Sequence, residues 1–166
     1  MSLTLAAVVA VVAAVLQLTI VQYLGINGAY PDLLLVVAVI ATFTWSTEAA
    51  ITLAFVGGLM IDLLAPRPIG LTAFTLLVST GIAALIARLI PRGRIVTAIG
   101  VTFVLSFVTD LLFLGMYTAL RGKLEVGDPI QLILPGALYS AAIAVVLAPA
   151  AVALHKRFAE RERVAW

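Results

Sequence analysis

The sequence predicts an all-α integral membrane protein with about six transmembrane helices in one bundle. Of its 166 residues, 64% are hydrophobic and only 11% are charged, and the mean hydropathy is +1.23, whereas soluble domains are roughly 45–50% apolar. Each membrane crossing needs about 20 residues, so a chain of this length holds about six crossings and little else. We therefore expect a polytopic transmembrane domain over residues 1–154 and a short basic cytoplasmic tail over residues 155–166.

The first apolar segment, Leu3 to Leu24, is long enough to cross a membrane. Because no Lys or Arg precedes it, we expect a retained helix rather than a cleaved signal peptide. Ala6, Ala10 and Ala14 recur every four residues, and such small residues allow close packing of another helix, either within the bundle or in a partner. The segment ends at Gly25 to Gly28, because Gly and Asn accept positive φ.

Two further apolar segments follow, and the first of them is short. Pro31 fits the first turn of a helix that runs to about Phe43, and Asp32 favours the positive end of that helix. A polar cap at Ser46-Thr47 starts a third helix, which runs to about Ala65. Segments two and three therefore form either two short spanning helices or a tilted hairpin that stops short of the far side.

The third and fourth segments are joined by the stretch Gly58 to Ala73, which combines an acid with a rigid turn. Pro66 and Pro68 lack backbone N–H groups and have fixed φ. The helix that carries Asp62 must therefore end just before them, and the next helix must begin after Gly70. The stretch predicts a hairpin between two apolar helices.

The last three apolar segments are expected at about residues 71–90, 95–119 and 129–154. Asp128-Pro129 starts the sixth segment as a cap and a first helical residue, and Pro135 and Pro149 are expected to kink or locally open it. Polar side chains share one helical face in the fourth segment (Thr72, Thr75 and Ser79) and in the fifth (Ser106, Asp110 and Tyr117).

The basic residues indicate the orientation of the chain. With six crossings and cytoplasmic ends, Arg67, Arg121 and Lys123 lie outside, and the other seven of the ten Lys and Arg lie inside. This asymmetry supports cytoplasmic N- and C-termini, and a hairpin of segments two and three would preserve it. The turn with both prolines is then outside the membrane, and Asp62 and Asp110 are in its outer half.

Asp62 and Asp110 are the acids that lie deep in apolar segments, where a charge costs several kcal/mol unless it pairs or reaches water. Asp62 is a candidate for ion or proton chemistry, but it can equally accept hydrogen bonds from a neighbouring helix end or pair with Arg67. A proton relay needs further titratable groups, and the one histidine, His155, lies in the basic tail. We therefore interpret Asp62 as a residue that fixes the hairpin.

The sequence contains no signal for reaction chemistry. It has no cysteine, no histidine metal motif, no phosphate-binding loop and no nucleophile motif. We predict no catalytic, cofactor or metal site and no enzyme activity. The basic residues lie at segment ends, which favours contact with membrane lipids over binding of nucleic acid.

Three motifs follow one another along the chain: Pro31-Asp32-Leu33-Leu34-Leu35, Gly58 with Asp62-Leu63-Leu64, and Pro68-Ile69-Gly70-Leu71 with Ala73. By these motifs the chain resembles the rod shape-determining protein MreD family, whose members are small six-helix proteins of the bacterial inner membrane. Length, helix count and the short basic tail agree across nearly the whole chain. Thr72 stands where family members often carry Asn, and Pro66 makes the turn stiffer than usual.

The resemblance implies a non-enzymatic scaffold of the cell-elongation complex. It would bind MreC, a single-span protein with an extracytoplasmic domain, and help couple cytoplasmic MreB filaments to the transglycosylase RodA and a penicillin-binding transpeptidase. The family is also similar in fold to the substrate-binding components of energy-coupling-factor vitamin transporters. The structural or partner-binding candidates are Pro31, Asp32, Gly58, Asp62, Pro66, Pro68, Gly70 and Asp110.

An alternative hypothesis is a small-molecule-binding or transport subunit, like those of vitamin uptake. Six helices, kinked segments and the polar faces of segments four and five could together line an outward cavity. The polar anchors available on those faces are few for a vitamin-sized ligand: Thr75, Ser79, Ser106, Asp110 and Tyr117.

Overall fold

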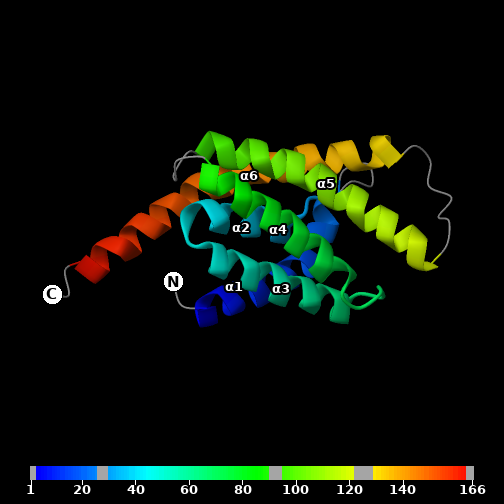
Figure 1. Cartoon of the computed structure of the whole chain (residues 1–166), viewed down its shortest axis with the longest axis horizontal. Helices are drawn as coiled ribbons and strands as arrows, with labels where there is room; N and C mark the ends of the chain where they lie inside the picture. The colour runs from blue at the N-terminus through cyan, green and yellow to red at the C-terminus, as the bar shows by residue number, and fades with distance from the viewer. Residues whose placement is uncertain (1–2, 26–29, 90–94, 122–128, 164–166) are drawn as a thin grey trace.

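The computed structural model describes residues 3–25, 30–89, 95–121 and 129–163. Within these ranges the chain forms six α-helices and one short 3₁₀ helix, and it contains no strand (Figure 1). The prediction of an all-α bundle with six helices is confirmed. The elements are α1 (Leu3–Thr19), η1 (Val21–Leu24), α2 (Leu33–Thr44), α3 (Thr47–Leu64), α4 (Leu71–Leu89), α5 (Ile95–Arg121) and α6 (Pro129–Arg163).

Helix α2 is the centre of the bundle. It packs against α1, α3, α4, α5 and α6, and a helix that is apolar on all sides is expected to be buried in this way. Its 12 residues span about 18 Å, which is well short of the roughly 30 Å hydrocarbon core. Its buried side chains are Leu34, Leu35, Val36, Ala38, Val39, Ile40, Ala41, Thr42 and Phe43.

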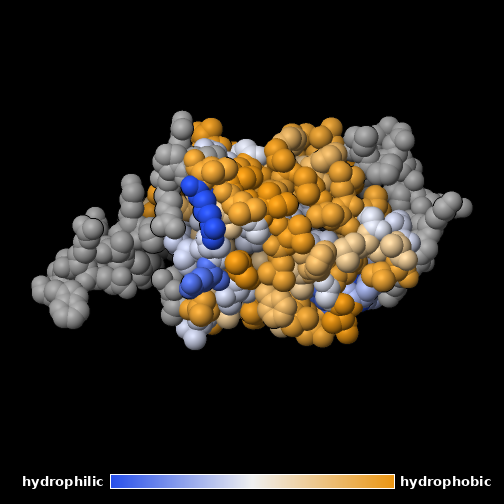
Figure 2. Space-filling model, in the orientation of Figure 1, coloured by the Kyte–Doolittle hydropathy of each residue, from blue (hydrophilic) through white to orange (hydrophobic). Residues whose placement is uncertain are grey.

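The other helices place apolar surface around this core. Helices α3, α4, α5 and α6 are each long and apolar enough to cross a membrane, whereas α1 and α2 are shorter. Figure 2 shows a broad hydrophobic band across the visible face, with hydrophilic residues gathered at one end. Large apolar side chains such as Val104, Leu138 and Val146 are exposed. The fold is that of an integral membrane helical bundle.

The first predicted segment is interrupted. We expected one crossing from Leu3 to Leu24, but α1 ends at Thr19 after 17 residues and a 3₁₀ turn follows. The Thr19 hydroxyl donates a hydrogen bond to the carbonyl of Val15 at 2.7 Å. A back-bonded threonine of this kind competes with regular helix geometry and often bends a helix.

The last helix is longer than predicted. We expected segment six to end near Leu154, but α6 continues to Arg163, so most of the basic tail is helical. The helix is continuous through Pro135 and Pro149. Figure 1 shows its C-terminal part extending beyond the other helices. The predicted cap at Asp128 lies outside the described residues.

Candidate functional site

Asp62 joins the end of α3 to the start of α4. Its side chain is buried, and its two carboxylate oxygens accept hydrogen bonds from the backbone N–H groups of Thr72 at 3.1 Å and Ala73 at 3.2 Å. The first N–H groups of a helix have no partner inside the helix and carry partial positive charge. The helix end therefore stabilises the buried acid, and among the described residues Asp62 forms no ion pair with Arg67.

Gly58 lies one turn before Asp62 on the same face of α3. A Cβ atom at Gly58 would lie 2.5 Å from the Cα and 2.9 Å from the N of Ala73. Backbone atoms cannot move aside as the end of a flexible side chain can. Gly58 therefore allows the backbone of Ala73 to pack closely against α3, and Asp62 accepts a hydrogen bond from the N–H of the same residue.

The turn between α3 and α4 is held by its own backbone. The Ala65 N–H donates to the carbonyl of Ile61 at 2.9 Å, and the Arg67 N–H donates to the carbonyl of Ala65 at 2.7 Å. Gly70 has φ of +90°, a backbone conformation that residues other than glycine rarely adopt. With Pro66 and Pro68 fixing φ on either side of Arg67, the turn presents that side chain from a rigid base.

Pro31 and Asp32 lie at the start of α2, where three helices meet. The Asp32 carboxylate accepts a hydrogen bond from the Leu35 N–H at 3.0 Å, so Asp32 is the N-cap of α2. The Asp32 N–H donates to the hydroxyl of Ser140 in α6 at 2.9 Å. The start of the central helix is thereby tied to the last helix of the chain.

Gln17 in α1 holds the same stretch from the other side. Its amide nitrogen donates to the carbonyl of Pro31 at 3.1 Å, and its amide oxygen accepts from the Leu33 N–H at 2.7 Å. Sequence reasoning gave no role to Gln17 or Ser140. Gln17 could have been found as one of the few polar residues of an apolar segment, whereas no local signal distinguishes Ser140.

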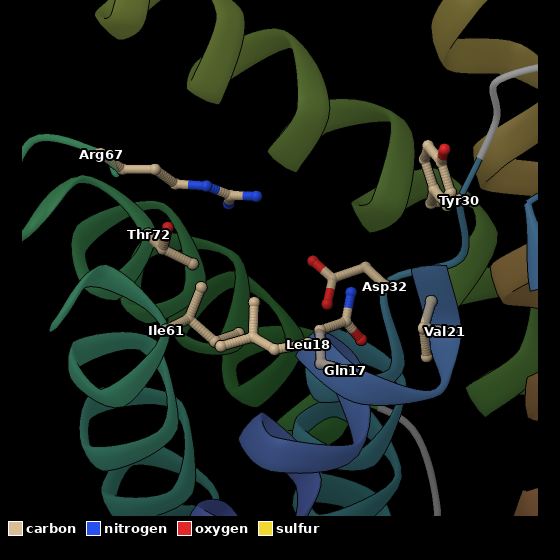
Figure 3. Close-up of a pocket in the computed structure, with 8 residues that line it drawn as sticks. All are labelled: Gln17, Leu18, Val21, Tyr30, Asp32, Ile61, Arg67 and Thr72. Atoms are coloured by element: carbon tan, nitrogen blue, oxygen red, sulfur yellow. The ribbon is translucent and has the colours of Figure 1, made fainter. Parts of the chain in front are cut away.

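A cavity of about 270 Å³ opens beside this junction. It lies where α1 ends and the turn between α3 and α4 begins (Figure 3). Arg67 extends into it from the turn, and the Asp32 carboxylate points toward the guanidinium from the start of α2. Among the described residues these two side chains form no ion pair within 4.0 Å. The lining residues are Gln17, Leu18, Val21, Tyr30, Asp32, Ile61, Arg67 and Thr72.

The guanidinium of Arg67 is positioned by an aromatic ring. It lies 5.3 Å from the ring centroid of Phe113 in α5, a distance at which cation–π attraction is significant. Phe113 in turn stacks on Tyr117, with ring centroids 6.0 Å apart. The guanidinium has five N–H donors, and the contact with the ring is electrostatic and not a hydrogen bond.

Asp110 in α5 is half-buried and lies close enough to Asp32 for the two charges to interact. Its carboxylate is near Gly136 of α6, since a Cβ atom there would be 3.9 Å from the Asp110 Oδ2 and 3.3 Å from the carbonyl oxygen of Tyr30. Asp32 and Asp110 therefore place two carboxyl groups at this junction.

The polar faces of α4 and α5 pack against each other instead of lining the cavity. Ser79 and Thr109 share a hydrogen bond of 2.6 Å between their hydroxyl groups. The hydroxyls of Thr72 and Ser106 are buried and have no hydrogen-bond partner in the part of the chain that the structure describes. Of the residues on these two faces, only Thr72 is a lining residue of this cavity.

The arrangement can hold a polar molecule, and it offers no evident reaction chemistry. Within the described ranges no group of three or more His, Cys, Asp or Glu could hold a metal ion. The hydrogen bonds of Gln17, Asp62 and Ser140 are made to backbone groups, which is the pattern of a structural network.

Comparison with known proteins gives one finding about the whole chain. The family model described as rod shape-determining protein MreD matches residues 1–158. No curated protein and no solved structure was found to match the chain. The expected similarity in fold to the substrate-binding components of energy-coupling-factor transporters therefore stays a prediction.

Proposed function

Because the chain belongs to the rod shape-determining protein MreD family, we propose that it is a non-enzymatic membrane scaffold of the bacterial elongation complex. Family membership supports a role in rod shape determination and is the observation that carries the proposal. The four long apolar helices support a multi-pass membrane protein. We assign it to the inner membrane, with residues 155–166 as its cytoplasmic end.

The proposed partners are MreC directly, RodA and a penicillin-binding transpeptidase within the complex, and MreB filaments indirectly. MreC has a single transmembrane helix, so its contact within the membrane is a helix against a helix face. Association in lipid depends on close van der Waals packing, which small residues allow. The docking face should therefore offer apolar surface that is exposed within the bundle, with a small residue where the partner helix comes closest.

Such a face lies between α4 and α5. An apolar groove of about 270 Å³ runs there, lined by Ile82, Ile86, Gly100, Val101, Val104, Leu105 and Val108. A Cβ atom at Gly100 would meet nothing within 4 Å, so the groove floor is open. We place the MreC helix in this groove.

Co-purification tests the scaffold role. The tagged protein, extracted from membranes in mild detergent, should retain MreC, because a helix docked in the groove survives gentle extraction. A control membrane complex must survive the same extraction. Loss of MreC while the control complex stays intact would remove the main support for the proposal.

The proposed orientation has both termini in the cytoplasm. It rests on the distribution of Lys and Arg, and it places the cavity beside Arg67 on the extracytoplasmic side. A reporter fused after Pro68 should give an extracytoplasmic signal. A cytoplasmic signal from this fusion would reverse the orientation.

One observation favours a second candidate function, a small-molecule-binding subunit. The cavity beside Asp32 combines opposite charges with apolar walls, which is the usual composition of a ligand site. Thermal stabilisation by a compound from a broad vitamin panel would support a transport role. Absence of stabilisation across the panel would count against vitamins as ligands.

A further inference from the structure

The cavity beside Asp32 holds a carboxylate and a guanidinium that face each other without contact (Figure 3). No ion pair within 4.0 Å joins Asp32 to Arg67 among the described residues. The Asp32 carboxylate accepts a hydrogen bond from the Leu35 N–H, and Arg67 is exposed and lies over Phe113. Both groups keep capacity for further polar contacts, so a molecule between them would bind both.

The two charges lie at different depths. Helices α2 and α3 are neighbours joined by a short link, and α2 has 12 residues where α3 has 18. At about 1.5 Å per residue, the start of α2 lies roughly 9 Å short of the end of α3. Arg67 is exposed in the turn beyond α3. The anionic group is therefore at the inner end of the cavity and the cation is at its mouth.

We propose that this cavity binds a small zwitterion, with its ammonium group at Asp32 and its anionic group at Arg67. The guanidinium is held by Phe113 and can bind a carboxylate or phosphate through its edge. The cavity volume of about 270 Å³ is below the roughly 300–1,000 Å³ of drug-sized sites, so the ligand is small.

The remaining walls agree with this class of ligand. Leu18, Val21 and Ile61 give an apolar side that suits a short aliphatic group. Thr72 also lines the cavity, and because its hydroxyl oxygen is fully buried, the contact that it offers a ligand is made by its other atoms.

Free amino acids and the phosphoethanolamine headgroup of a lipid share this chemistry. In the lipid, the ammonium lies beyond the phosphate as seen from the acyl chains. Entry with the ammonium first would therefore leave the acyl chains at the cavity mouth, away from the hydrocarbon core. The depths of Asp32 and Arg67 favour a free zwitterion over a headgroup.

This inference extends the second candidate function, and it does not depend on the scaffold role. The test uses the full chain in nanodiscs of phosphatidylglycerol, a lipid without an amine. Glycine, alanine and O-phosphoethanolamine are the zwitterionic probes, and ethanolamine and acetate carry one charge each. A zwitterion at saturation should raise Tm by at least about 2 °C, whereas the single-charge probes should not.

Three variants locate the site. Arg67→Gln and Asp32→Asn should each weaken binding by at least about tenfold, because each removes one charge-assisted contact. Asn caps a helix about as well as Asp, so Asp32→Asn should keep the unliganded Tm. Arg67 is exposed, so its replacement loses the contact with Phe113 but disturbs no buried side chain. Arg88→Gln, in the last turn of α4, is the matched control and should bind as the wild type does.

Each other outcome overturns the proposal. No shift with any zwitterion would mean that the cavity holds only water. Unchanged binding in Arg67→Gln would place the site elsewhere. Stabilisation by phosphatidylethanolamine in the nanodisc, without any effect of free zwitterions, would replace the free molecule by a lipid headgroup. Retention of MreC is measured separately, so failure here leaves the test of the scaffold role intact.

Discussion

Gly58 and Ala73 bring the backbones of α3 and α4 into direct contact, since a Cβ atom on Gly58 would lie 2.5 Å from the Cα of Ala73. Four residues later, Asp62 accepts a hydrogen bond from the Ala73 N–H. The two residues fix both the spacing and the end of the hairpin. This junction is the base from which the turn presents Arg67 to the cavity.

Gly58→Ala should destabilise the fold by about 1–3 kcal/mol, because the new methyl group must push two helix backbones apart. Alanine is the better helix former by roughly 1 kcal/mol, so the packing effect must exceed this gain. Thermal unfolding in detergent measures the result. Gly81→Ala in α4, where a Cβ atom meets nothing within 4 Å, is the control and should be neutral or stabilising. Equal Tm values for the two variants would contradict the close contact.

Asp62→Ala should lower stability by about 2–4 kcal/mol, because the N–H groups of Thr72 and Ala73 lose a charged acceptor in a buried place. Asp62→Asn should have a smaller effect, since its amide oxygen still accepts one of the two hydrogen bonds. Unfolding and retention of MreC are the two measurements. Normal stability and normal rod shape with Asp62→Ala would show that the residue is dispensable.

Ser140→Ala should cost about 1–3 kcal/mol, because it leaves the Asp32 N–H without its acceptor inside the bundle. Thr118→Ala is the control. Its hydroxyl donates to the carbonyl of Gly115 on an exposed surface of α5, so its loss should change stability by less than about 0.5 kcal/mol. If both variants unfold at the same temperature, the hydrogen bond between α6 and the start of α2 does not contribute to the stability of the fold.

Gly100→Leu should reduce retention of MreC, because the leucine side chain fills the groove between α4 and α5. Gly115→Leu on the same helix is a matched control outside that groove. A Cβ atom at either glycine meets nothing within 4 Å, so both variants should fold. MreC recovered per tagged protein in detergent is the measurement. Full retention of MreC by Gly100→Leu would show that the MreC helix docks on another face of the bundle.

Helix ends were predictable from sequence because their chemistry is local. Ser46 is an N-cap in the structure, as predicted from its side chain and the apolar run after it. Pro31 was placed in the first turn of the second helix, but α2 begins at Leu33 with Asp32 as its N-cap, so Pro31 precedes the helix. The prolines and Gly70 likewise predicted the turn after α3, since each restricts or permits a particular backbone conformation. The continuation of α6 past Leu154 was not predicted, because hydropathy indicates where apolar residues end and not where a helix ends.

Contacts between distant segments could not be predicted. The alternative hypothesis placed the polar faces of the fourth and fifth segments along a cavity, but Ser79 and Thr109 form a hydrogen bond with each other. The cavity formed where Gln17, Asp32 and Arg67 meet, and these come from three separate parts of the chain. Periodicity assigns a residue to a helix face, whereas the identity of the facing helix depends on the packing of the whole bundle.

The hydrogen bond from Asp32 to Ser140 joins residues 108 positions apart, and this separation has a consequence for biogenesis. Helix α2 is made early, but its packing partner α6 is made last. Until α6 leaves the ribosome and enters the membrane, the surface of α2 that α6 covers has to be shielded by lipid or by the insertion machinery. Completion of the bundle is therefore a late, post-insertion event, and chains truncated before α6 should be targets for membrane proteases.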